Sequence, residues 1–463
     1  MENSTIAAIS TYPGKSALGV IRVSGKDTFS IISKIVRFSS GMPIDKIQPR
    51  AQNLAGLYDQ SDFLLDKPLV TVFKAPNSYT GEDMAEISCH GSLLILQSAM
   101  EALCHFGAQP ALPGEFTKRA FLNNKMDLAQ AEAVSDIIDA DSKASLKLSL
   151  FQLEGKESGA ITALREKTAS LLSSLELEID FAHEDTPKLD SNEALKKLSL
   201  INAGIDALLK NADLGIMIKN GVRCVIAGKP NAGKSSVMNA LLRKNRAIVT
   251  GLAGTTRDVI EDRFDLENIP VRLFDTAGIR HAENQAEKEG VNRAKTALKE
   301  GDIILFIVDG SLPLTNDDIH AFKETDGRPV ILCINKSDLE QKITARDAKV
   351  FLGANDAAET VNINCVKEGG IIPLTNALKN IIIGSGNTAL LDGILVANLR
   401  HKQALLEARR ALKDAADAFS KNLSFEFAAS DIKHAAASLG GITGVISTEE
   451  ILESIFSGFC IGK

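Results

Sequence analysis

Residues 223–235 read Arg-Cys-Val-Ile-Ala-Gly-Lys-Pro-Asn-Ala-Gly-Lys-Ser, and this stretch decides the fold of the central part of the chain. The apolar run 224–227 predicts a buried strand. The loop that follows fits the pattern G-x-x-x-x-G-K-[ST], with its fixed positions at Gly228, Gly233, Lys234 and Ser235. The glycines let successive backbone N–H groups turn toward phosphate oxygens, and a helix beginning near Lys234 adds its positive dipole end. The stretch therefore predicts a phosphate-binding loop, with the Lys234 ammonium on the outer phosphates and the Ser235 hydroxyl on Mg²⁺.

Two further motifs follow apolar runs that predict strands, and they select the nucleotide. Asp275-Thr276-Ala277-Gly278 follows the run 271–274; an acid at a strand end can hold Mg²⁺ through water, and Gly278 leaves room for the γ-phosphate. Asn335-Lys336-Ser337-Asp338 follows the run 330–334. The Asp338 carboxylate can accept hydrogen bonds from the N1–H and the exocyclic amine of guanine, a pattern that adenine lacks. A surface turn is the alternative for either motif alone, but the three motifs together predict a GTP site.

The residues between and after these motifs bear on hydrolysis. Gly254-Thr255-Thr256-Arg257-Asp258 lies between the first two motifs, where a threonine can complete the coordination of Mg²⁺ while the γ-phosphate is present. The position after Gly278 is Ile279, whose apolar side chain cannot orient the attacking water. The following segment offers three acids, and their spacing does not choose among them: Glu283, Glu287 and Glu289. A solvated helix face is the alternative for all three.

The bulk composition is that of a globular protein with several domains. The 463 residues suggest about three domains. The net charge of −7 gives no support for a globally basic nucleic-acid binder, so contact with RNA requires a local patch. The six cysteines have no C-x-x-C spacing, so they imply neither a zinc site nor a disulfide framework and fit a reducing cytosol. Because the longest apolar runs are far too short to span a bilayer, we expect a cytoplasmic protein with no membrane segment.

The order of patterns along the chain predicts a multidomain protein of α/β and α+β type. Residues 1–122 mix strand-like runs at 5–9, 18–23, 69–73 and 85–89 with a helical pattern at 93–106, which indicates an α+β module. Residues 123–220 carry long helical periodicity and form the first part of a helical bundle. Residues 221–383 alternate strand and helix, with strands expected at 223–227, 271–274, 303–308 and 330–334. Helical patterning resumes after the linker 384–388, from Leu390, and 384–463 form the second part of the bundle. The α/β domain is therefore inserted into a discontinuous helical region.

Many short stretches of the chain resemble one family nearly end to end, the bacterial tRNA-modification GTPases MnmE (also called TrmE). The matching stretches are Thr5-Ile6-Ala7-Ala8, Arg22-Val23-Ser24-Gly25, Tyr79-Thr80-Gly81-Glu82-Asp83, His90-Gly91, 113–123 (PGEFTKRAFLN), 127–133 (DLAQAEA), the GTP motifs and 459–463 (FCIGK). The resemblance implies an N-terminal folate-binding and dimerisation module, a discontinuous helical bundle and an inserted Ras-like P-loop GTPase domain.

The activity that the resemblance implies is a K⁺-stimulated hydrolysis of GTP. A flavoprotein partner of the MnmG (GidA) type would join a homodimer of this chain in a heterotetramer or a larger complex. Together they would modify carbon 5 of the wobble uridine of certain tRNAs to a carboxymethylaminomethyl or aminomethyl group. The one-carbon donor would be 5,10-methylene- or 5-formyl-tetrahydrofolate. The alternative from another class is a GTP-dependent switch without tRNA chemistry, such as a ribosome-assembly factor.

The resemblance also implies roles for single residues. Folate would be bound by Arg22, Glu82, Lys125 and Lys463. K⁺ would be bound by Asn231, Thr250, Leu252 and Thr255, and Mg²⁺ by Ser235 and Thr256. Glu287 would orient the attacking water, beside Lys234 as the second catalytic group. Cys460 is a candidate nucleophile, with a packing role as the alternative.

The nucleotide-contacting positions extend over all the GTP motifs. They are Asn231, Ala232, Gly233, Lys234, Ser235, Ser236, Thr250, Gly251, Leu252, Ala253, Gly254, Thr255, Thr256, Asp275, Thr276, Ala277, Gly278, Asn335, Lys336 and Asp338. The chain departs from the family at two places. Gly251 stands where the family has an acid in the loop around K⁺, and Asn364-Cys365-Val366 replaces a Ser-Ala-Lys type sequence beside the guanine. Backbone contacts survive both changes, so we expect binding to persist.

Overall fold

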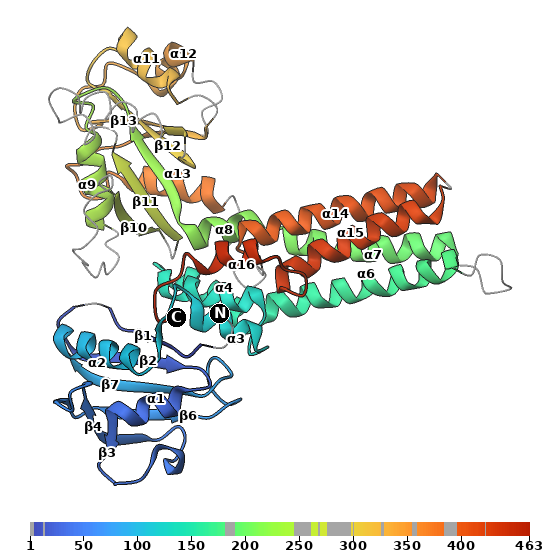
Figure 1. The fold of residues 1–463 in the computed structure, drawn as a ribbon. Helices are drawn as coiled ribbons and strands as arrows, with labels where there is room; N and C mark the ends of the chain where they lie inside the picture. Colours follow the sequence, from blue (N-terminus) through green and yellow to red (C-terminus); the bar gives the residue numbers. More distant parts are fainter. Residues whose placement is uncertain are drawn as a thin grey trace. The chain divides into compact units, whose positions relative to one another are not determined.

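The computed structural model of the chain describes residues 4–12, 14–180, 190–244, 261–266, 269–275, 298–299, 301–325, 328–353, 359–383, 396–421 and 423–463. These residues form two compact units (Figure 1). Unit 1 comprises Met1–Asp139, Leu150–Ile205 and Ala404–Lys463, and unit 2 comprises Ala140–Ser149 and Asp206–Gln403. Segments from both ends of the chain thus build unit 1, as expected for a fold with an insertion.

The N-terminal part of unit 1 is an α+β module. Its strands are β1 (Ile6–Ile9), β2 (Ser16–Ser24), β3 (Val36–Phe38), β4 (Gln52–Tyr58), β5 (Leu64–Asp66), β6 (Leu69–Phe73), β7 (Met84–Gly91) and β8 (Gln109–Pro110). They form one sheet in the order β3-β4-β6-β7-β2-β1-β8, with β5 on β4, and only β1 and β8 pair in parallel. Helices α1 (Thr28–Ile35) and α2 (Leu93–His105) share an apolar core with the inward residues of this sheet. The four predicted strands and the predicted helix are confirmed.

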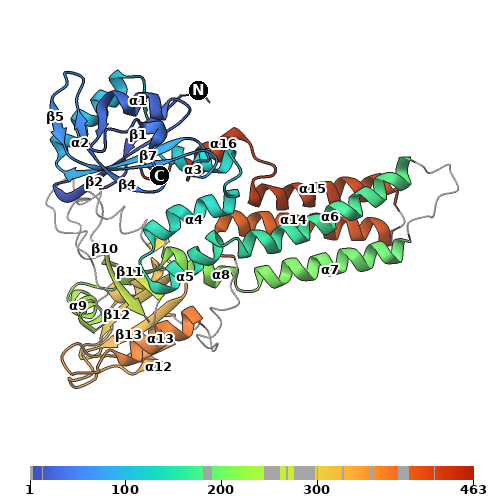
Figure 2. The same ribbon diagram turned by 90° about the horizontal axis from the view of Figure 1, so that it is seen from below.

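The rest of unit 1 is helical. Its elements are α3 (Glu115–Leu122), α4 (Leu128–Asp139), α6 (Lys156–Asp180), α7 (Ser191–Leu209), α14 (Leu399–Ser420), α15 (Phe425–Thr443) and α16 (Glu449–Phe456). Helices α6, α7, α14 and α15 lie side by side along their length (Figures 1 and 2). Two of them precede the inserted segment in sequence and two follow it, so the discontinuous bundle is confirmed.

One predicted helix boundary is wrong. The helical pattern from Leu390 predicts a helix through Phe419, but α14 begins at Leu399, and residues 396–398 are not helical. Leu390 itself lies outside the described residues. The start has a local cause, because the side-chain oxygen of Asn398 accepts a hydrogen bond from the backbone N–H of Arg400 at 2.8 Å. Asparagine in this position is a favoured N-cap, so the helix begins at the residue that follows it.

Unit 2 is an α/β sandwich around a sheet whose order is β10-β11-β9-β12-β13-β14. The strands are β9 (Val222–Ala227), β10 (Glu261–Leu266), β11 (Ile269–Asp275), β12 (Ile303–Asp309), β13 (Val330–Asn335) and β14 (Glu359–Asn362). The hairpin β10–β11 is antiparallel, and the other pairs are parallel. The four predicted strands are confirmed. All seven residues of β12 are buried, as expected for a parallel strand that is covered on both faces.

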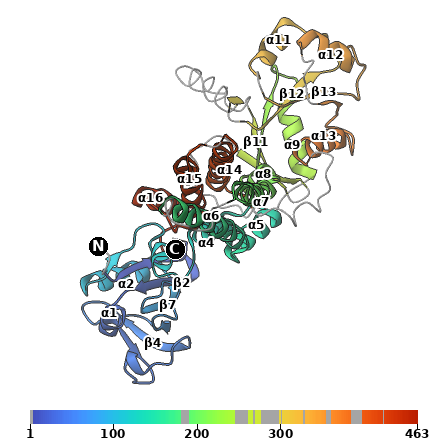
Figure 3. The same ribbon diagram turned by 90° about the vertical axis from the view of Figure 1, so that its right-hand side faces the viewer.

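Helices cover both faces of this sheet (Figure 3). Apolar side chains of α8 (Ala212–Asn220), α9 (Lys234–Lys244) and α13 (Ile372–Ile383) belong to one core cluster. The cluster on the other face includes residues of α11 (Asn316–Lys323) and α12 (Ala345–Leu352). The helix α5 (Lys143–Leu153) begins in unit 2, where Ala144 and Leu148 join the first cluster, and ends in unit 1.

No helix among the described residues has the length and apolar character needed to cross a membrane.

Candidate functional site

The phosphate loop of unit 2 connects β9 to α9 in the way the motif predicts. Gly228 and Gly233 have φ of +137° and +100°, a region that side chains with a Cβ rarely adopt. A Cβ on Gly228 would lie 2.3 Å from the carbonyl oxygen of Ile307, and one on Gly233 would lie 2.1 Å from Nδ2 of Asn335. The two glycines are therefore required by close approach as well as by backbone angle. Between them, Asn231 is exposed and also has a positive φ, of 63°.

Lys234 is the buried cation of this loop. Its ammonium donates hydrogen bonds to the carbonyl oxygens of Gly228 at 2.9 Å and Lys229 at 2.8 Å. The loop is thus wound around the ammonium, which holds the group at the mouth of the loop. Ser235 and Ser236 follow in the first turn of α9, and both are exposed.

The predicted base loop lies next to the phosphate loop. Asn335, the last residue of β13, is buried, and its side-chain amide donates to the carbonyl oxygen of Ala232 at 3.0 Å. Lys336 follows with a φ of 61°, and Asp338 is exposed. Ser337 donates its backbone N–H to the carbonyl oxygen of Ile363 at 3.1 Å. The two motifs, about one hundred residues apart in sequence, therefore form one site.

The segment that departs from the family lies beside this base loop. The Asn364 side chain donates to the Ser337 hydroxyl at 3.4 Å, and the Cys365 thiol lies 3.8 Å from the side-chain oxygen of Asn335. Burial, and then the negative charge of Asp338, raise the pKa of the Cys365 thiol. The segment 364–366 thus lies beside Asn335, Ser337 and Asp338 of the predicted base loop.

Several predicted site residues lie outside the described residues. They are Thr250, Gly251, Leu252, Ala253, Gly254, Thr255, Thr256, Thr276, Ala277, Gly278 and Glu287. Asp275 is the last residue of β11, and β11 is the parallel neighbour of β9. Within the described part of the chain, no group of three or more His, Cys, Asp or Glu side chains has the arrangement of a metal site.

Two aspartates at the same edge of the sheet escaped the sequence analysis. Asp309 ends β12 and pairs with Lys336, and Asp318 in the first turn of α11 pairs with Lys229. Asp309 carried a usable signal, because it follows a long apolar run in the same way as Asp275. Asp318 carried none, since an acid in the first turn of a helix is ordinary.

A second polar site lies in unit 1, where the C-terminal tail meets the N-terminal sheet. The Arg22 side chain pairs with Glu86 at 2.7 Å and donates to the carbonyl oxygen of Gly462 at 3.3 Å. Its guanidinium lies 5.6 Å from the ring centre of Tyr79. Burial and the charge of Arg22 lower the pKa of the Lys463 amine, against Glu86 and Cys460, which act to raise it. The structure therefore brings Arg22 and Lys463 together.

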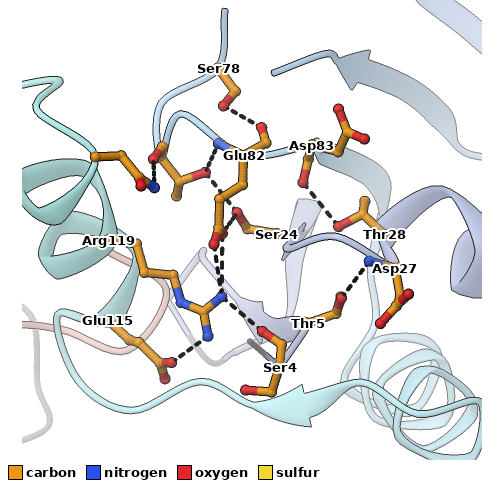
Figure 4. Close-up of polar contacts among 12 residues, drawn as sticks. Ser4, Thr5, Ser24, Asp27, Thr28, Ser78, Glu82, Asp83, Glu115 and Arg119 are labelled. Atoms are coloured by element: carbon orange, nitrogen blue, oxygen red, sulfur yellow. Dashed lines mark hydrogen bonds and ion pairs between the residues drawn. The ribbon is translucent and has the colours of Figure 1, made fainter. Parts of the chain in front are cut away.

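Glu82 is held in a network of its own (Figure 4). Its carboxylate accepts hydrogen bonds from the Ser24 hydroxyl at 2.7 Å and from Arg119 at 3.2 Å. Arg119 also donates to Glu115 at 2.8 Å and to the carbonyl oxygen of Ser4 at 2.8 Å. The sequence analysis missed Arg119, although a charged residue beside the apolar positions Phe116 and Ala120 is a signal for a buried ion pair. The remaining predicted ligand, Lys125, is exposed and donates to the carbonyl oxygen of Pro76 at 2.9 Å.

Cys460 is exposed at the C-terminal tail, so a buried packing role does not apply to it. The tail is fixed by backbone contacts around the thiol. Gly114 donates to the carbonyl oxygen of Cys460 at 3.5 Å, and Phe116 donates to that of Lys463 at 3.2 Å. The thiol is close enough to the Lys463 amine to affect its pKa.

Comparison with known proteins places the whole chain in one family. A model of the "GTP-binding protein TrmE N-terminus" matches residues 5–125, and a model of the "MnmE helical domain" matches residues 128–460. Curated relatives named tRNA modification GTPase MnmE are similar over their full length. The relative from Aquifex aeolicus is 40% identical over 460 residues, covering 99% of each chain. The one from Thermoanaerobacter pseudethanolicus is 39% identical with the same coverage, and the one from Alkaliphilus oremlandii is 38% identical over 462 residues, which cover 100% of this chain and 99% of the relative. The chain therefore belongs to the MnmE (TrmE) family of tRNA modification GTPases.

Proposed function

We propose that this protein hydrolyses GTP as part of a tRNA-modification reaction. The observation that carries the proposal is the hydrogen bond from Asn335 to the carbonyl oxygen of Ala232, which joins the base loop to the phosphate loop. A loop with the phosphate pattern alone suits any nucleoside triphosphate. Joined to a loop that carries Asp338, it suits a guanine nucleotide, because the carboxylate matches the donor pair of that base.

In this proposal, the loop and its lysine bind the phosphates. The Lys234 ammonium, held by its two loop carbonyls, faces the outer phosphate oxygens, and the N–H groups at the start of α9 face the same oxygens. Mg²⁺, held by Ser235 and Thr256, and K⁺, held by Asn231, Thr250, Leu252 and Thr255, supply positive charge against the β- and γ-phosphates when bound. The described residues fit both ions, since Asn231 and Ser235 are exposed on the loop and offer oxygen ligands. Glu287 orients the attacking water in place of the glutamine that Ile279 replaces.

Unit 1 is proposed to hold the one-carbon donor, a 5,10-methylene- or 5-formyl-tetrahydrofolate. The cationic Arg22 and Lys463 suit the carboxylates of such a ligand, and Tyr79 beside Arg22 suits its ring. Glu82 and Lys125 complete the proposed set, and Cys460 stands next to Lys463 as the candidate nucleophile. A folate bound there would supply the one-carbon unit for the modification of carbon 5 of the wobble uridine.

The proposed assembly has several partners. Two copies of the chain associate through the N-terminal module, whose Leu18 and Leu94 are 64% and 72% exposed and thus offer apolar surface. A flavoprotein of the MnmG (GidA) type and the tRNA join them in the cytoplasm. The domain organisation that goes with this proposal is 1–122 for the N-terminal module, 123–220 and 384–463 for the helical domain, and 221–383 for the GTPase domain.

The potassium part of the proposal is tested by the rate of GTP hydrolysis in K⁺ and in Na⁺ buffers of equal ionic strength. We expect at least about tenfold faster hydrolysis in K⁺, because a positive group aimed at developing charge is worth that much or more. Asn231→Ala removes the response to K⁺, and Lys234→Ala serves as the control that has lost phosphate binding. Equal rates in the two buffers, or an Asn231→Ala variant that keeps its response, contradict the assignment.

A further inference from the structure

The segment 309–318, which connects β12 to the first turn of α11, supplies a buried carboxylate to each nucleotide-binding loop. Asp309 accepts from the ammonium of Lys336, in the base loop, at 2.5 Å. Asp318 accepts from the ammonium of Lys229, in the phosphate loop, at 2.9 Å. The aspartate side chains are 3% and 0% exposed, respectively. The lysine side chains are 36% and 18% exposed, so each pair joins a buried carboxylate to a cation that still reaches water.

Hydrogen bonds to both carboxylate oxygens hold Asp309 in place and favour its charged form. Its other oxygen accepts from the backbone N–H of Ser311 at 3.0 Å and from the Ser311 hydroxyl at 2.6 Å. Burial acts to raise the pKa of Asp309, but the hydrogen bonds from Lys336 and Ser311 outweigh it and hold the pKa below its ordinary value. The ion pair also stabilises the backbone of Lys336, whose φ of 61° is an unfavourable conformation for a residue with a Cβ.

Asp318 does more than cap its helix. It forms a capping box with Thr315, and the same box recurs at α12 with Thr344 and Asp347. Asp347 is exposed, whereas Asp318 is buried and its Oδ1 has no hydrogen-bond partner in the described structure. Burying a carboxylate costs free energy that a cap does not require. The ion pair with Lys229 distinguishes the α11 box, since it compensates the buried charge.

The two lysines are connected to the parts of the site that touch the nucleotide in the proposed function. The carbonyl oxygen of Lys229 accepts from the Lys234 ammonium at 2.8 Å, so an anchored Lys229 fixes a carbonyl that positions Lys234. Lys336 lies between Asn335, which is bonded to the phosphate loop, and Asp338 two residues later. An anchored Lys336 therefore fixes the path of the chain that presents Asp338.

We propose that the segment 309–318 is a brace that positions both nucleotide-binding loops, with Asp318 setting the phosphate loop through Lys229 and Asp309 setting the base loop through Lys336. Both aspartates are positioning residues, since neither touches the nucleotide. The inference rests on the proposed function, because the loops have this role only in a protein that binds a guanine nucleotide.

The test compares the affinities of full-length variants for GDP and for inosine diphosphate, which lacks the exocyclic amine that Asp338 would accept from. Asp309→Asn and Asp318→Asn keep the side-chain shape and remove the charge. We expect Asp309→Asn to weaken GDP binding on the order of tenfold and to reduce the preference for GDP over inosine diphosphate, because the base loop is misplaced. We expect Asp318→Asn to lower the affinities for GDP and for inosine diphosphate by the same factor, on the order of tenfold. The preference for GDP over inosine diphosphate is then unchanged.

Matched variants separate positioning from folding. Asp347→Asn removes the same cap carboxylate from α12, where no lysine is paired, and leaves both affinities unchanged. Lys229→Met reproduces the effect of Asp318→Asn, and the double variant is no weaker than either single variant, because one interaction is lost in all three. Lys229→Met breaks the phosphate-loop pair from its lysine side, and it tests that half of the brace if Asp318→Asn does not fold.

Two results overturn the brace. One is that the aspartate variants bind both nucleotides as Asp347→Asn does. The other is that both variants lose affinity for the two nucleotides by one common factor, which indicates a general loss of folding. If the unmodified protein binds GDP no better than ADP, the proposed function fails and the brace fails with it. If the unmodified protein prefers GDP and the aspartate variants bind GDP and inosine diphosphate with unchanged affinity, only the brace is contradicted and the proposed function stands.

Discussion

At the scale of single residues, the nucleotide site depends on positions where only one side chain fits. Gly233 is the sharpest case, since its φ is +100° and a Cβ there would lie 2.1 Å from the Asn335 amide. The same amide joins the phosphate loop to the base loop. A methyl group at this position therefore disturbs both loops at once.

Gly233→Ala is expected to weaken GDP binding severely and to destabilise unit 2 by about 1–3 kcal/mol, because the alanine is strained and displaces Asn335. Calorimetric titration with GDP and the midpoint of thermal unfolding measure the two effects. Gly159→Ala is the matched control; this glycine lies in α6 with no atom within 4 Å of an added Cβ, so the change stabilises the helix by about 0.5–1 kcal/mol. Normal GDP affinity in Gly233→Ala contradicts the described loop.

The cysteines give a second prediction at this scale. Cys460 is exposed, whereas Cys89, Cys224 and Cys333 are buried. Burial raises the pKa of Cys89 to about 12, and it raises the pKa of Cys224 and Cys333 strongly as well, which disfavours the reactive thiolate. We expect iodoacetamide at pH 8 to label Cys460 first and to reach the three buried thiols only after denaturation, as followed by mass spectrometry of peptides. Early labelling at Cys224 or Cys333 is incompatible with the described sheet.

At the scale of elements, a buried arginine is one of the contacts that hold α3 to the N-terminal module. Arg119 pairs with Glu82 from the loop before β7 and with Glu115 one turn earlier in α3. Arg119 lies on the buried side of α3, together with Phe116 and Ala120. Removing the cation leaves two carboxylates without their partner in a largely buried place.

Arg119→Met is expected to lower the free energy of unfolding in urea by about 2–4 kcal/mol, because both partners remain charged. Arg37→Met is the control, because Arg37 also pairs with an acid, Asp62, but both side chains are exposed. We expect the free energy of unfolding of this variant to be nearly that of the unmodified protein. Equal effects of the two substitutions would mean that the Arg119 network adds nothing beyond a surface ion pair.

The elements also show how far the sequence predicts this protein. Hydrophobic runs and short spacings were enough to predict the strands β9, β11 and β13 and the loops that follow β9 and β13. The loop after β11 lies outside the described residues. The pair of Lys229 and Asp318 joins residues 89 positions apart, and the contact of Arg22 with Gly462 joins residues 440 positions apart. Such contacts depend on how finished elements pack, and no local pattern encodes them. The start of α14 was missed for a different reason, since the apolar pattern continues past the cap at Asn398.

At the scale of the whole molecule, the two candidate sites lie in different compact units. The nucleotide site belongs to unit 2, and the site of Arg22 and Lys463 belongs to unit 1. Three helices, α5, α7 and α14, begin in one unit and end in the other.

The most direct test of the proposed function is the nucleoside composition of tRNA from a strain that lacks the gene for this protein. We predict that the modified wobble uridine disappears from digested tRNA, as measured by liquid chromatography and mass spectrometry. The full chain restores it, whereas Lys234→Ala, which has lost the buried cation of the phosphate loop, does not. A wobble uridine that stays modified in the deletion strain, or that Lys234→Ala restores in full, contradicts the account.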